Sequence, residues 1–115
     1  MTTSATLRMT IGDYRQFELT VKKFGVIQDL AGIQSLNFKL QNEAGVEVAN
    51  WGLGSGVVVQ SPTTNGQAIL SITPAMLVWA TQTMGLTYTW SLVDSIGNPT
   101  LVLERGAMYL TLPPP

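Results

Sequence analysis

Residues 85–93 read Gly-Leu-Thr-Tyr-Thr-Trp-Ser-Leu-Val, and this stretch decides the fold class. Within it, Tyr88, Trp90 and Leu92 alternate with small polar residues. Successive side chains of a β-strand point to opposite faces of the sheet, so a period of two indicates a strand with one apolar and one polar face. The stretch therefore predicts a long β-strand whose apolar face lies in a core.

The same alternation recurs outward from this strand in both directions. It predicts further strands within residues 7–11, 17–21, 36–41, 46–48, 57–59, 68–72, 101–103 and 108–112. Thr73-Pro74 has the form of a helix N-cap followed by proline at the first helical position, so one short helix is expected from there to Gly85. About eight short strands separated by turns are typical of an antiparallel β-sandwich, here with a single domain over residues 1–115 and short extended termini.

The spacing of two aromatic residues narrows the type of sandwich. Tyr88 comes two residues before Trp90, which stands where an antibody domain has its second core cysteine. This is the spacing of a tyrosine corner, whose hydroxyl bonds to the upstream backbone; the alternative is that Tyr88 is an ordinary core aromatic. The predicted fold is therefore all-β, an immunoglobulin-like antiparallel β-sandwich of about seven to eight strands with one short helix.

The composition excludes several kinds of active site. Only 11% of the 115 residues are charged and the net charge is −1, and the chain has neither histidine nor cysteine. Zinc sites of Cys and His, thiol nucleophiles, Ser-His triads and disulfides are therefore excluded. Uncharged polar groups cost less to desolvate than ions, so such a surface favours burial against neighbouring subunits, with a secreted Thr-rich β domain as the alternative.

Acidic residues are present, but their spacing does not favour chemistry. Glu43 and Glu47 flank a hairpin turn, where no cleft would separate them or raise a pKa. Asp29 and Asp94 are expected to accept backbone N–H bonds in their own turns rather than to bind calcium. We predict no catalytic residue, no metal ligand and no cofactor.

The positive charges do not form an electrostatic footprint for nucleic acid. Lys22-Lys23 beside Phe24 is interpreted as a solvated strand end on a chain of net negative charge. No apolar stretch approaches the roughly 18 residues of a membrane span, and residues 1–14 lack the apolar core of a signal peptide. We therefore expect neither nucleic acid nor membrane as a partner, and synthesis in the cytoplasm.

A series of short motifs follows in a fixed order along nearly the whole chain. They are Gly12-Asp13, residues 17–21 (Phe-Glu-Leu-Thr-Val), residues 29–32 (Asp-Leu-Ala-Gly), Phe38-Lys39-Leu40, Gly45, Asn65-Gly66, Thr73-Pro74, Gly85, Tyr88, Asp94, Gly97 and Arg105-Gly106 before the last strand. The chain thereby resembles small bacteriophage and prophage virion domains similar to the N-terminal immunoglobulin-like domain of baseplate upper proteins. Ile11 and Ala31 depart from the Arg and Thr that are usual in that family.

The resemblance implies a non-enzymatic virion structural protein, an adaptor subunit of the tail, neck or baseplate. It would assemble in the host cytoplasm through contacts with copies of itself and with other virion proteins, as a stand-alone subunit. A capsid decoration or head-fibre protein is the alternative location, and a carbohydrate-binding module is the alternative of another class. Structural roles are expected for Asp29, Gly32, Tyr88, Trp90, Gly97 and Gly106.

Candidate contact residues lie in the segments that carry least charge. Edge strands normally carry charge or proline, and residues 57–59 carry neither, so they are expected to form an edge that a neighbour completes or, alternatively, an interior strand. Trp51 is interpreted as an assembly hot spot, a sugar-stacking residue or a plug at one end of the sandwich. The candidates are Trp51, Val57, Val58, Val59, Gln60, Trp79, Pro113 and Pro114, and the favoured contact segments are residues 51–60, residues 2–6 and the C-terminal prolines.

Overall fold

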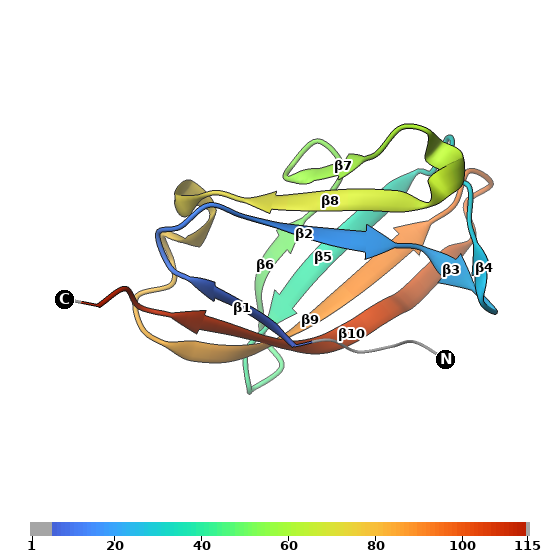
Figure 1. Cartoon of the computed structure of the whole chain (residues 1–115). Helices are drawn as coiled ribbons and strands as arrows, with labels where there is room; N and C mark the ends of the chain where they lie inside the picture. The colour runs from blue at the N-terminus through green and yellow to red at the C-terminus, as the bar shows by residue number, and fades with distance from the viewer. Residues whose placement is uncertain (1–5, 115) are drawn as a thin grey trace.

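The computed structural model describes residues 6–114, in which two β-sheets face each other as a sandwich (Figure 1). One sheet has the strand order β1-β10-β9-β5-β6, the other has the order β2-β8-β7, and β3 and β4 form a separate hairpin. The strands are β1 (Leu7–Thr10), β2 (Arg15–Thr20), β3 (Lys22–Lys23), β4 (Val26–Ile27), β5 (Ser35–Gln41), β6 (Glu47–Trp51), β7 (Val57–Val59), β8 (Gln67–Ile72), β9 (Met84–Val93) and β10 (Pro99–Thr111). Two 3-10 helices, η1 (Thr63–Asn65) and η2 (Pro74–Leu77), follow β7 and β8.

Most neighbouring strands are antiparallel: β10 with β9, β9 with β5 and β5 with β6 in the larger sheet, and β2 with β8 and β8 with β7 in the smaller one. The prediction of an all-β sandwich is confirmed. One pairing differs from the expected antiparallel arrangement, because β1 runs parallel to β10, with Leu7 opposite Met108 and Thr10 opposite Thr111.

Three local expectations are wrong. The helix after Thr73 is the four-residue η2, closed by the short i to i+3 bonds of a 3-10 helix, and Gly85 lies inside β9 rather than at a helix end. Residues 101–103 and 108–112 belong largely to one strand, β10. Gly106 therefore lies within that strand, opposite Tyr88, and not in a turn before it.

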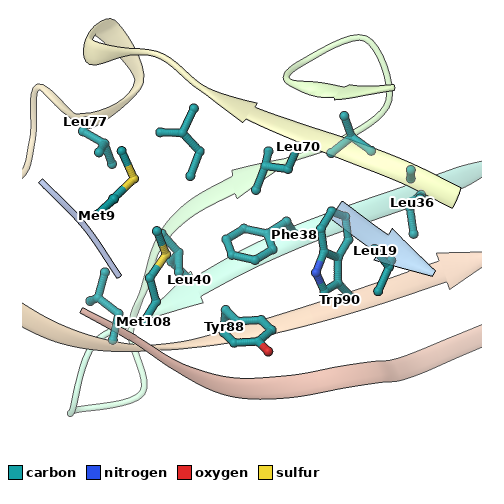
Figure 2. Packing of buried hydrophobic residues seen from close by; sticks show 14 of the residues in the cluster. Met9, Leu19, Leu36, Phe38, Leu40, Leu70, Leu77, Tyr88, Trp90 and Met108 are labelled. Carbon is teal, nitrogen blue, oxygen red and sulfur yellow. The ribbon is translucent and has the colours of Figure 1, made fainter. Parts of the chain in front are cut away.

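The core forms where the apolar faces of the two sheets meet. In β5, buried and half-buried residues alternate without exception, as the sequence pattern predicts. Figure 2 shows the Phe38 ring within the buried cluster, beside those of Tyr88 and Trp90. Phe38 stacks on Tyr88 with ring centroids 5.4 Å apart and meets Trp90 edge-on at 5.0 Å. Aromatic rings from β5 and β9 therefore fill the middle of the sandwich.

The hairpin of β3 and β4 was not predicted from the sequence. It lies at one end of the sandwich (Figure 1) and turns through Phe24 and Gly25, both with positive φ (52° and 78°). Positive φ at both central residues is what a two-residue type I′ turn requires. Lys22 and Lys23 are therefore not simply the end of β2, because they form a strand of their own.

Candidate protein interface

An apolar groove of about 430 Å³ runs beside the edge strand β7. The turn at residues 30–33 forms one wall, and β7 with Leu53 forms the other. Val57 is almost fully buried, whereas Val58 is 56% and Leu53 38% exposed. None of the lining residues within the described part of the chain is charged. This surface can bury apolar groups of a partner without desolvating an ion.

The position of β7 decides between the two interpretations of residues 57–59. The strand pairs with β8 alone, so it is an edge strand and not an interior one. Bonds at its two ends, from Ser71 N to Gly56 O and from Gln60 N to Gln67 O, are both 2.8 Å long. Antiparallel residues alternate in their bonding, so Val57 and Val59 direct their backbone groups away from β8.

The free edge of β7 is shorter than expected because the preceding turn covers part of it. The N–H of Val57 donates to the carbonyl of Gly52, and its carbonyl accepts from the N–H of Gly54, both at 3.2 Å. Val59 is left as the residue whose backbone groups face the open side. A partner at this edge would therefore gain more from the apolar side chains than from a long ladder of backbone bonds.

Asp29 fixes the turn that forms one wall of the groove, and Asp94 fixes a second turn that contacts the first. Asp29 Oδ1 accepts from Ala31 N at 2.9 Å, and Asp94 Oδ1 accepts from the backbone N–H groups of Ile96 and Asn98 at 3.1 and 2.9 Å. Both bond as predicted from the sequence. Gly32 and Gly97 have positive φ in these two turns, at 71° and 92°. A Cβ on Gly32 would lie 3.6 Å from Ser95 Cβ, so the turns are in contact.

Both candidate tryptophans pack onto the protein itself. Trp51, at the end of β6, is half-buried and stacks on Phe38 with a centroid distance of 6.1 Å and an angle of 3° between the ring planes. Trp79 is half-buried after η2, and its indole N–H donates to the carbonyl of Met76 at 3.0 Å. Trp51 therefore extends the aromatic core to β6, the edge strand of the larger sheet, and its roles as hot spot, sugar-stacking residue or plug stay predictions.

The remaining predicted contact residues do not gather at one place. Gln60 lines the groove at the end of β7. Pro113 and Pro114 are exposed beyond the end of β10. Of residues 2–6, only Thr6 is among the described residues. Leu53, within the predicted contact segment 51–60, also lines the groove. Sequence reasoning missed Leu30 and Ile33, which line the groove from a turn, where no period marks a side chain as inward or outward.

The buried aromatic Tyr88 meets an acidic side chain. Tyr88 is fully buried on β9, and its hydroxyl forms a hydrogen bond with the Glu104 carboxylate on β10. Burial raises the pKa of Glu104, and the hydrogen bond from Tyr88 opposes that rise. A bond from Tyr88 to the upstream backbone, which defines a tyrosine corner, stays a prediction.

We expect Glu104→Gln to make the protein more stable at pH 7. With its folded-state pKa raised, the native protein binds the proton more tightly than the unfolded chain, so stability falls as pH rises from the ordinary value of 4.5 through the raised value. Urea unfolding at a series of pH values checks this: the advantage of Glu104→Gln should be largest at pH 7 and shrink below pH 4.5. Tyr88→Phe removes the hydrogen bond that lowers the Glu104 pKa, so in this variant stability should go on falling to a higher pH than in wild type. A Glu104→Gln protein less stable than wild type at pH 7 would contradict this expectation.

Neither a metal site nor a membrane-spanning helix is found among the described residues, and comparisons with known proteins gave no match. Within residues 6–114 no three acidic residues lie close enough together to hold a metal ion, and no helix there has the length and hydropathy to cross a membrane. The sequence matches no protein-family model, and a search of curated proteins finds no relative.

Proposed function

We propose that this chain is a non-enzymatic structural subunit of a bacteriophage virion, an adaptor of the tail, neck or baseplate that works through protein–protein contacts. The observation that carries the proposal is the groove beside β7, an apolar surface with no charged lining residue among those described. A surface of this kind suits association, because the fully buried centres of protein interfaces are depleted in charge. The virion is proposed from the order of turn and strand motifs along the chain.

The low charge of the whole surface supports the same function. Charged residues make up 11% of the chain, less than half of the roughly 25% usual for soluble domains. In the described residues, large apolar side chains such as Phe24, Val58, Val78 and Ile96 are more than half exposed. A subunit surrounded by neighbours covers such side chains, and a free monomer leaves them in water.

Purified phage particles provide the test. We expect quantitative mass spectrometry of particles whose genome encodes this chain to find it at a fixed ratio to the major capsid protein. Deletion of its gene should leave incomplete particles. Gold-labelled antibody at the tail or neck would support an adaptor, whereas label spread over the head would favour the capsid-decoration alternative. Infectious particles of normal composition formed without the chain would contradict the proposal.

A further inference from the structure

The tip of the β3–β4 hairpin is the most exposed apolar feature among the described residues. Phe24 is 101% exposed, Val26 62% and Ile27 48%. We call these three residues the knob. The hairpin extends from the end of the sandwich (Figure 1), and its base is fixed by a bond from Gln28 N to Val21 O at 3.0 Å. An apolar knob on a fixed base presents its side chains to a partner without first having to fold.

The backbone at Phe24 departs from what local preferences would select. Its φ of 52° is in the left-handed region, which costs an L-residue about 1–2 kcal/mol and which asparagine and glycine tolerate best. A large aromatic residue therefore occupies a turn position that disfavours it, and there it gains no burial. Strain of this kind persists where function requires the side chain.

The same chain carries a surface that complements the knob. The groove beside β7 is apolar and wide open to solvent, with a volume of about 430 Å³, so the apolar tip of a neighbouring molecule can reach its lining. Asp29 directly precedes the groove wall at residues 30–33 and places a negative charge beside it. Lys22 and Lys23 precede the knob, and neither has an ion-pair partner among residues 6–114. Apolar groups and charges therefore match between the two surfaces.

We propose that the knob of one copy inserts into the groove of a second copy of this chain, with Lys23, which lies opposite Val26 on the hairpin, facing Asp29. This inference rests on the proposed role in assembly and names the partner. Two copies related by a two-fold axis would make this contact twice and close as a dimer, whereas copies related by another rotation would build a ring or a filament. A membrane partner is less favoured, because two lysines on a chain of net charge −1 attract anionic lipid weakly and the groove would stay uncovered.

Two single variants and their mixture test the contact. Phe24→Asn removes the ring while giving the turn a residue it prefers, so it should fold at least as stably as wild type. Val58→Lys places a cation on the groove wall, opposite the lysines of the incoming knob, at an exposed strand position. Each variant alone should weaken self-association about tenfold or more, as expected for loss of an interface hot spot. Tyr14→Asn, at another exposed aromatic, is the matched control and should associate like wild type.

The mixture distinguishes this contact from any other. Phe24→Asn keeps an intact groove and Val58→Lys keeps an intact knob, so sedimentation of the two together should show a one-to-one heterodimer that grows no further. Wild type that stays monomeric at millimolar concentration, or variants that associate normally, would overturn the inference. Binding to phosphatidylserine vesicles that Phe24→Asn loses and Val58→Lys retains would overturn it in favour of a membrane. None of these results bears on whether the chain is found in purified particles, which decides the proposed function.

Discussion

Phe38→Ala is expected to lower the free energy of unfolding by about 3–5 kcal/mol, the usual cost of removing a buried aromatic ring. Phe38 is fully buried and packs against three other rings, those of Trp51, Tyr88 and Trp90. These neighbours come from β6 and β9, strands whose positions are set by backbone ladders on both sides of β5, so they cannot collapse into the space left behind. A domain of this size has a total stability of about 5–15 kcal/mol, so the variant should lose between about a fifth and all of it.

The same substitution at an exposed phenylalanine is the control for Phe38. Phe24→Ala removes an identical side chain from a position that is 101% exposed, so its unfolding free energy should stay within about 0.5 kcal/mol of wild type. Urea unfolding of both variants, measured on dilute protein, checks the difference. Equal losses in the two variants would show that the aromatic cluster does not stabilise the core as its geometry indicates.

Gly66→Ala is expected to have the second largest effect. Gly66 has φ of 64°, and a Cβ there would lie 2.6 Å from the carbonyl oxygen of Gln28 and 3.1 Å from that of Val21. Backbone carbonyls cannot rotate away, and the Gly66 carbonyl itself accepts a 2.7 Å bond from Val21 N. The positive φ alone costs about 1–2 kcal/mol, and moving the backbone adds to it. The total loss should therefore exceed that expected from the turn conformation alone.

Gly45→Ala separates the two contributions at Gly66. Gly45 also has positive φ, 80°, but nothing lies within 4 Å of a Cβ placed there. Its replacement should cost only the conformational penalty of about 1–2 kcal/mol. Thermal and urea unfolding of the two variants give the contact contribution as their difference. A loss at Gly45 as large as at Gly66 would contradict the steric argument.

The strands of the sandwich could be predicted because the direction in which each side chain points depends only on its position along the strand. In β5 and β9, apolar and polar residues alternate, and each apolar residue faces the core for the same geometric reason. The parallel pairing of β1 with β10 could not be predicted in this way. It joins segments at opposite ends of the chain, and alternation within a strand does not specify its partner or its direction.

The two surfaces of the candidate interface were predictable to different degrees. Residues 57–59 could be predicted as a contact site because an edge strand without charge is unusual, and the groove lies beside them. The opposite wall comes from the turn at 30–33, whose side-chain directions depend on how the sheets pack. The knob was not predicted for two reasons. The strands β3 and β4 have two residues each, too few to show a period of two. The turn between them has Phe24 at a position where such turns usually have asparagine or glycine, so the sequence does not indicate a turn there.

The parallel pairing of β1 and β10 has a mechanical consequence. A pull applied backwards along the chain at Leu7 and forwards at Thr111 would slide the two strands past each other. All the backbone hydrogen bonds between the two strands would then carry the load together, including the 2.8 Å bond from Ile11 N to Thr111 O. They would not break one after another. The strand ends are thus joined in a shear geometry, in which rupture requires several bonds to break together. Such a domain would transmit tension along a chain of linked subunits before it yields.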